Sequence, residues 1–147
     1  MDKDHLEQIK QDLEKLLAEL REKNQEVPVV VEGDNDIVAL KTLELPGEVL
    51  KLNQGKPIFN LVEEWSQKYR EMIILTDWDR KGGRLARILS EAFDANDMKY
   101  DMKFRKKLAF LCKKEIKDVQ GLPKFMDNLE TRLASRTMCE TWNPKTN

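Results

Sequence analysis

The stretch Met72–Asp79, with the sequence MIILTDWD, decides the predicted fold. Its first four residues are all apolar, which is typical of a parallel strand that is buried on both faces. Asp77 and Asp79 follow directly where this strand ends. Because ligands of open parallel sheets bind at the carboxyl ends of the strands, we expect an α/β domain with its functional site at this point.

A second strand with an acidic end precedes this stretch in the chain. The β-branched run Val27–Val31 predicts the strand, and Glu32 follows it. Apolar residues at helical spacing begin at Ile37, with Asp34 or Asp36 as the expected N-cap of that helix. Strand, turn and helix therefore follow one another here as they do after Met72.

Two shorter strands complete the predicted sheet, at Glu48–Leu52 and near Met98–Met102. Strands that alternate with helices favour a parallel sheet with right-handed crossovers. We expect chain breaks at Arg80–Gly83, so that helical structure starts near Leu85, and at Gly121–Pro123. Apolar residues spaced by three or four positions predict the helices, at about 3–23, 37–43, 58–69, 85–96, 104–112 and 122–133.

The composition fits one soluble domain. The chain has 147 residues, of which 40% are hydrophobic, and a net charge of −1. No apolar run approaches the ~20 residues that a bilayer span needs, and the polar N-terminus is unlike a signal peptide, so we expect a cytoplasmic protein without a membrane partner. His5 is the single histidine, and Cys112 and Cys139 form no CxxC pair, which argues against zinc and for reduced thiols.

We divide the chain into an amphipathic N-terminal helix over residues 1–26, a core that contains the sheet over 27–103, and a basic helical extension over 104–147 that packs on the core. The N-terminal helix carries an apolar stripe, which either packs on the sheet or binds a protein partner or a second copy of the chain. Its members are Leu6, Ile9, Leu13, Leu16, Leu17 and Leu20.

The acidic residues at the two strand ends predict a metal site. If these strands are neighbours, Glu32, Asp77 and Asp79 converge within reach of one ion. Alternation along an extended segment sends Asp77 and Asp79 to the same side. Carboxylates without His or Cys are oxygen ligands that suit a hydrated Mg²⁺ in contact with a substrate phosphate. Taken singly, each acidic group is more typical of a surface turn or a helix cap than of a metal site.

Basic side chains gather after the predicted metal site. Residues 1–79 contain 10 basic and 18 acidic side chains, whereas residues 80–147 contain 16 and 9. Cations at a helix N-terminus oppose the helix dipole, so the first group favours phosphate contact; it comprises Arg80, Lys81, Arg84 and Arg87. Arg105 and Lys106, with the lysines around them, either extend this track or form a solvated helix face.

Two motifs carry a resemblance to a known family. They are Val31-Glu32-Gly33-x-x-Asp36 and Leu75-Thr76-Asp77-x-Asp79-Arg80-x-Gly82. They resemble the Toprim domain of type IA and type II topoisomerases, bacterial primases, OLD-family nucleases and the 5S ribosomal RNA maturation nuclease, and are most similar to small stand-alone primase-like Toprim proteins. The resemblance covers residues 27 to about 101 and implies a Rossmann-like sheet of four parallel strands flanked by helices.

The resemblance also implies a chemistry. It implies Mg²⁺ at Asp77 and Asp79, with Glu32 as a further ligand or as general acid or base, and Asp36 joins the candidate ligands. The implied partner is RNA or DNA, and the implied reaction is phosphodiester cleavage or nucleotidyl transfer. Gly33 and Gly82 are the loop glycines of the two motifs.

Two positions depart from the family pattern. Gly83 stands where many topoisomerases have a third acidic residue, so a second fully ligated metal is not expected. Asp34 stands where small Toprim nucleases often have a basic residue, so this loop is not expected to contact phosphate.

Other functions compete with this one. A non-catalytic nucleic-acid adaptor with a structural Mg²⁺ is the main alternative. Receiver domains and haloacid-dehalogenase phosphatases also place acidic residues at strand ends, but Lys81 stands where the phosphatase motif has Thr or Val. The chain has no phosphate-binding loop of the GxxxxGK[ST] type, no GxGxxG and no GxSxG elbow.

Overall fold

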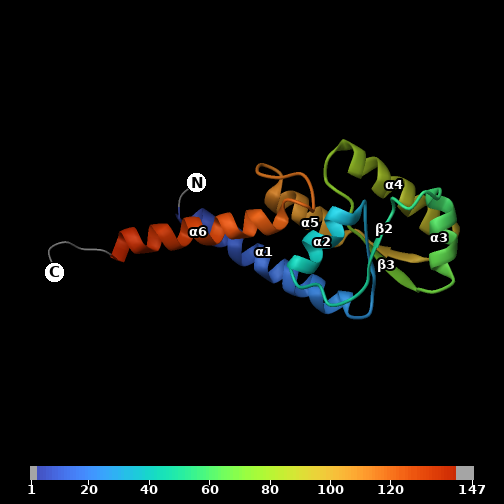
Figure 1. The fold of residues 1–147 in the computed structure, drawn as a ribbon, viewed down its shortest axis with the longest axis horizontal. Helices are drawn as coiled ribbons and strands as arrows, with labels where there is room; N and C mark the ends of the chain where they lie inside the picture. The colour runs from blue at the N-terminus through green and yellow to red at the C-terminus, as the bar shows by residue number, and fades with distance from the viewer. Residues whose placement is uncertain (1–2, 142–147) are drawn as a thin grey trace.

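The central element is a parallel sheet of four strands in the order β2-β1-β3-β4 (Figure 1). The computed structural model describes residues 3–141. All three strand pairs are parallel, and Val30 of β1 faces Leu50 of β2 and Ile74 of β3 in the register. The strands are β1 (Val29–Val31), β2 (Val49–Lys51), β3 (Glu71–Ile74) and β4 (Lys99–Asp101). The predicted α/β fold with four parallel strands is confirmed.

Helices cover both faces of the sheet. Val29, Val31 and Ile73 point to one hydrophobic cluster, whereas Val30 and Ile74 point to the other, because successive side chains of a strand alternate between faces. The first cluster packs against α1 (Lys3–Asn24), α2 (Asp34–Thr42), α5 (Lys103–Cys112) and α6 (Leu122–Thr141). The second packs against α3 (Ile58–Ser66) and α4 (Arg80–Ala95).

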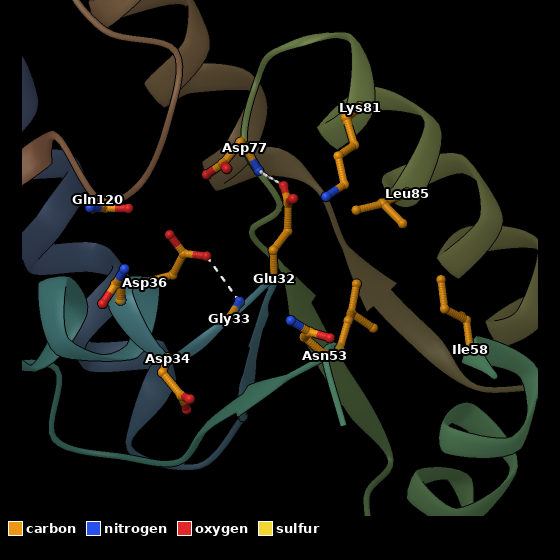
Figure 2. A pocket seen from close by; sticks show the side chains of 12 residues that line it. Glu32, Gly33, Asp34, Asp36, Asn53, Ile58, Asp77, Lys81, Leu85 and Gln120 are labelled. Atoms are coloured by element: carbon orange, nitrogen blue, oxygen red, sulfur yellow. Dashed lines mark hydrogen bonds between the residues drawn. The ribbon is translucent and has the colours of Figure 1, made fainter. Parts of the chain in front are cut away.

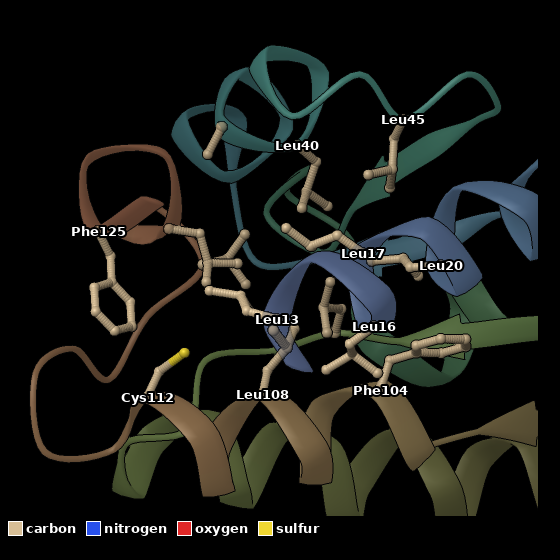
Figure 3. Packing of buried hydrophobic residues seen from close by; sticks show 14 of the residues in the cluster. Leu13, Leu16, Leu17, Leu20, Leu40, Leu45, Phe104, Leu108, Cys112 and Phe125 are labelled. Atoms are coloured by element: carbon tan, nitrogen blue, oxygen red, sulfur yellow. The ribbon is translucent and has the colours of Figure 1, made fainter. Parts of the chain in front are cut away.

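The apolar stripe of α1 belongs to the protein's own core. Leu13, Leu16, Leu17 and Leu20 are each at most 4% exposed, and Figure 3 shows them between α2 and α5. Helix α1 also lies beside α6 (Figure 1). Of the two expected uses of the stripe, the structure shows packing inside the domain, so these leucines are not available to a partner.

The start of α4 differs from the prediction. The glycines do not break the chain, because α4 begins at Arg80 with Asp79 as its N-cap, and the Asp79 side chain accepts a hydrogen bond from the Gly82 amide at 2.7 Å. A Cβ atom on Gly82 would lie 1.8 Å from the carbonyl oxygen of Asp77. Gly82 therefore permits a close approach between the loop and the first helical turn.

The start of α2 also differs, whereas α6 begins at the predicted residue, Leu122. Helix α2 has Gly33 as its N-cap, not Asp34 or Asp36, and the Asp36 carboxylate accepts a hydrogen bond from the Gly33 amide at 3.0 Å. Helix α6 starts at Leu122 and includes Pro123, because a helix tolerates proline in its first turn, where amides have no intrahelical partner. The predicted break at Gly121–Pro123 is therefore confined to the residues before Leu122.

Of the two cysteines, the structure describes the side chain of Cys112. Cys112 is a free thiol in the core, as expected, and burial raises its pKa to about 12, which makes it unreactive. The side chain of Cys139 lies outside the described residues. Over the part of the chain that the structure describes, no helix is both long and apolar enough to cross a membrane.

Candidate functional site at the carboxyl edge of the sheet

A cleft of about 650 Å³ opens where β1 and β3 end (Figure 2). Glu32 and Asp77 enter it from the ends of these neighbouring strands, and Asp36 enters it from the first turn of α2. Lys81 enters it from the first turn of α4. The pairing of β1 with β3 therefore brings together three of the predicted site residues that are carboxylates, as the acidic strand ends indicated.

Hydrogen bonds hold two of these carboxylates in place. The Glu32 carboxylate accepts a hydrogen bond from the Asp77 amide at 2.9 Å, which ties the end of β1 to the loop after β3 (Figure 2). The Asp77 carboxylate accepts one from the Val119 amide at 2.9 Å. Val119 belongs to the connection between α5 and α6, so a segment 42 residues further along the chain positions Asp77.

The cleft concentrates negative charge. Burial raises the pKa of Asp77 to about 7, and the nearby charges of Glu32, Asp36 and Asp118 act in the same direction. Burial also raises the pKa of Asp36, which is 7% exposed, with Glu32 and Asp118 again contributing. Burial and neighbouring carboxylates thus disfavour the charged forms of Asp77 and Asp36, which a bound cation would relieve.

Asp118 was not predicted. It lies in the connection before α6, where its side chain accepts a hydrogen bond from the Gly121 amide at 2.8 Å. It follows no strand and sits in the basic part of the chain, so no local pattern distinguishes it from an ordinary turn residue. Only the packing of the α5–α6 connection against the loop after β3 brings it near Asp77 and Asp36.

Asp79 does not line the cleft. Its side chain caps α4 instead, and strand alternation does not govern Asp77 and Asp79, because β3 already ends at Ile74. Among the described residues, no group of three or more His, Cys, Asp or Glu side chains is close enough to hold a metal ion together. Asp79 as a metal ligand stays a prediction.

The loop between β3 and α4 is fastened on several sides. The Thr76 hydroxyl donates a hydrogen bond to the Gly82 carbonyl at 2.8 Å. The Trp78 indole donates to the Ile116 carbonyl at 2.8 Å, and the Trp78 amide donates to the Lys117 carbonyl at 2.8 Å. Such a network fixes the backbone that carries Asp77, which is what precise placement of a reacting group requires.

Arg105 belongs to this network. Its guanidinium donates hydrogen bonds to the carbonyl oxygens of Thr76 at 3.1 Å and Asp77 at 2.8 Å. Burial lowers the pKa of Arg105, while the charges of Asp79, Glu32 and Asp77 oppose that effect. The structure thus shows a clamp on the Asp77 loop, and the predicted contact of Arg105 with nucleic acid stays a prediction.

The other predicted basic residues lie in two places. Lys81 lines the cleft, whereas Arg80, Arg84 and Arg87 are exposed and share one stripe of α4, since positions i, i+4 and i+7 fall on the same helix face. Lys106 lines a separate groove between α1 and α5. Arg80, Arg84 and Arg87 therefore share α4 with Lys81, whereas Lys106 lies in a different groove.

The donor chemistry of the cleft fits Mg²⁺. All the acidic groups are hard oxygen ligands, and Mg²⁺ commonly takes one or two carboxylates together with water and substrate phosphate. Glu32 and Asp77 already approach each other through the bond between the Glu32 carboxylate and the Asp77 amide. Glu32 and Asp77 are therefore the two cleft residues that would hold the ion.

Several known proteins are similar to this chain. Two proteins described as UPF0292 proteins are similar to the chain: one from Methanosarcina acetivorans is 38% identical over 121 residues, which cover 82% of this chain and 83% of that protein. The other, from Methanocaldococcus jannaschii, is 31% identical over 73% of this chain and 84% of its own length. A solved structure described as a putative protein from Aquifex aeolicus superposes with a TM-score of 0.63 at 29% identity, over 74% of this chain and 95% of that one.

The family model for the Toprim domain matches residues 27–111, which is more than half of the chain and includes both acidic strand ends. This match confirms the resemblance that the two motifs carry. The chain belongs to the Toprim domain family.

Proposed function

We propose that this protein is a Mg²⁺-dependent enzyme that cleaves or forms phosphodiester bonds in nucleic acid. The Toprim domain associates the chain with metal-dependent functions on nucleic acids. The observation that carries the finer proposal is the contact between the Glu32 carboxylate and the Asp77 amide, in a cleft that also holds Asp36 and Lys81.

Each of these residues suits a role at a phosphodiester. Mg²⁺, when bound, neutralises charge on the phosphate. Asp77 would hold the ion, and Glu32 would either complete its shell or take or give a proton at the attacking or leaving hydroxyl. Lys81 reaches the same cleft from α4 and would bind a phosphate oxygen.

Exposed arginines extend the binding surface beyond the reacting phosphate. Arg80, Arg84 and Arg87 project from one stripe of α4, next to the turn that carries Lys81. Their charges are spaced along a helix and remain free to contact successive phosphates of a strand. A polyanion is therefore a better match than a free phosphate ester.

An adaptor that binds nucleic acid without reaction is the second candidate. The bond from the Gly82 amide to Asp79 and the bond from the Val119 amide to Asp77 support it, because both use carboxylate oxygens for the fold itself. In that case the ion would only stabilise the loop. A protein partner at the N-terminal helix is not part of this proposal, since the helix buries its apolar stripe.

Incubation with labelled single-stranded and duplex RNA and DNA, with Mg²⁺ or with EDTA, tests the proposal on a denaturing gel. Glu32→Gln keeps an oxygen that can accept the Asp77 amide but removes the charge and the proton-accepting function. We expect Mg²⁺-dependent products with wild type and a loss of at least ~100-fold in rate with Glu32→Gln.

Glu63→Gln serves as the matched control, because Glu63 is exposed on α3 and does not line the cleft. It should leave product formation unchanged. Salt-sensitive binding without any product would favour the adaptor. Equal rates for wild type and Glu32→Gln would contradict the role of Glu32 in the reaction.

A further inference from the structure

The cleft has a second wall that a metal and a phosphate do not require. Leu52 at the end of β2, Ile58 at the start of α3 and Leu85 in the second turn of α4 all line it. In Figure 2, Ile58 and Leu85 lie on the side of the cleft away from Asp36 and Gln120. We call these three aliphatic residues the apolar shelf.

The apolar shelf is the outer edge of the second hydrophobic cluster. Leu52 belongs to the cluster and is 8% exposed, while Ile58 and Leu85 pack against it and remain partly exposed. The shelf is therefore supported from beneath by β-strand and helix side chains. Apolar surface held open beside a group of carboxylates gains free energy when a flat apolar ligand group covers it.

We propose that the apolar shelf receives the base of an unpaired nucleotide within a strand, while the phosphate of that nucleotide lies at the carboxylates and Lys81. This inference rests on the proposed function and names its substrate class. A volume of about 650 Å³ is ample for one nucleotide, and both walls belong to this single cleft.

Base pairing would prevent this placement. In a duplex the faces of a base are stacked and its edge is paired, so only a single-stranded or flipped-out base can lie against the shelf. Asn53 is exposed next to Leu52 and lines the cleft, so its amide can donate and accept hydrogen bonds at the edge of a base or at a sugar hydroxyl.

The surroundings favour a strand over a free mononucleotide. Arg80, Arg84 and Arg87 lie on the helix that also contributes Lys81 and Leu85. A mononucleotide would leave this exposed stripe without an anion, whereas the neighbouring phosphates of a strand would reach it. The ligand is thus an unpaired stretch of nucleic acid.

Three probes of equal length separate base contact from phosphate contact: a labelled ten-nucleotide thymidine strand, a ten-unit strand with no bases but the same phosphates, and the thymidine strand paired to its complement. Fluorescence anisotropy with Mg²⁺ measures their affinities, and a gel verifies that the strands stay intact. We expect the thymidine strand to bind about tenfold more tightly than either of the others.

Leu85→Ser should remove this preference and leave affinity for the strand without bases unchanged. Ile58→Ser, at a different element, should do the same, which guards against a folding defect in one variant. Ile88→Ser is the matched control, because Ile88 is partly exposed on α4 but does not line the cleft, and it should retain the preference.

Each outcome separates this inference from the proposed function. Equal binding of the strands with and without bases would overturn the base site while leaving a phosphodiester enzyme intact. Thymidine 5′-phosphate that binds as tightly as the strand would overturn the choice of a strand. No binding of any probe by wild type would overturn both the proposed function and this inference.

Discussion

Replacement of Asp77 by asparagine should stabilise the metal-free protein at pH 8. Burial and the charges of Glu32, Asp36 and Asp118 raise the pKa of Asp77 to about 7, whereas an unfolded chain releases this proton near pH ~3.9. Between these values the folded state binds more protons than the unfolded state. The free energy of unfolding of wild type therefore falls as the pH rises through this window and levels off above about pH 7.

The size of the effect follows from the shift. About three pH units correspond to ~4 kcal/mol at full value, but solvent screens a carboxylate that is only half-buried, so about 1–2 kcal/mol is expected. The amide side chain introduced by Asp77→Asn would keep an oxygen for the Val119 amide, which now bonds to the carboxylate at 2.9 Å. The substitution thus removes the charge and leaves the positioning bond.

Urea unfolding in EDTA, followed by circular dichroism at pH 4 and pH 8, measures this difference. The two proteins should be about equal at pH 4, and Asp77→Asn should be the more stable at pH 8. Added Mg²⁺ should stabilise wild type and not the variant. Asp127→Asn, an exposed site on α6, is the control and should change neither measurement.

A variant less stable than wild type at pH 8, or a pH dependence that is the same in both proteins, would refute the reasoning. It would mean that burial and the neighbouring carboxylates do not raise the pKa of Asp77 in the folded protein. The argument for a cation in the cleft would then lose its electrostatic basis.

Three more perturbations test the loop, a buried side chain and the phosphate contact. Gly82→Ala should destabilise the fold by at least ~2 kcal/mol in urea unfolding, because the new Cβ would meet the Asp77 carbonyl oxygen at 1.8 Å. Gly83→Ala is the control and should be neutral or stabilising, because its Cβ would meet only the Arg105 side chain, at 3.7 Å. Asn24→Ala should lower the free energy of unfolding by about 3 kcal/mol, since Asn24 is 1% exposed and its side chain bonds to the Val27 and Glu48 carbonyls and to the Gly47 amide. A loss under ~1 kcal/mol would contradict this. Lys81→Ala should weaken binding of nucleic acid and reduce the slope of log affinity against log salt concentration by about one. Lys68→Ala, at an exposed lysine, is the control, and an unchanged slope for Lys81→Ala would exclude a phosphate contact.

Several features of the fold follow from local sequence alone. The apolar runs at Val27–Val31 and Met72–Leu75 contain most of β1 and β3, because residues that are apolar on both faces need cover on both sides, and the sheet has helices on each face. The leucine spacing of α1 predicts its helix within one residue of the observed end at Asn24. Strand ends at Glu32 and Asp77 meet because parallel strands present their carboxyl ends at one edge.

Where one local pattern competes with a long-range contact, the tertiary structure decides. The glycines after Asp79 look like a chain break, but close packing of Gly82 on the Asp77 carbonyl makes them the first turn of α4. That turn engages the Asp79 side chain as a cap, and so separates it from the cleft. Strand alternation is a local rule that holds only to Ile74, where β3 ends.

The surroundings of Asp77 show the same division. Its place after an apolar strand is visible in the sequence, and so is its acidic partner Glu32. Its contacts with Val119, Asp118 and Arg105 join segments that are 28 to 42 residues away, and no periodicity or motif links them to Asp77. Local sequence therefore determines which strands form and which acidic residues end them. The raised pKa and the fixed position of Asp77 depend instead on the packing of α5 and the α5–α6 connection. The reason is that burial and charge–charge repulsion depend on distance in space and not along the chain.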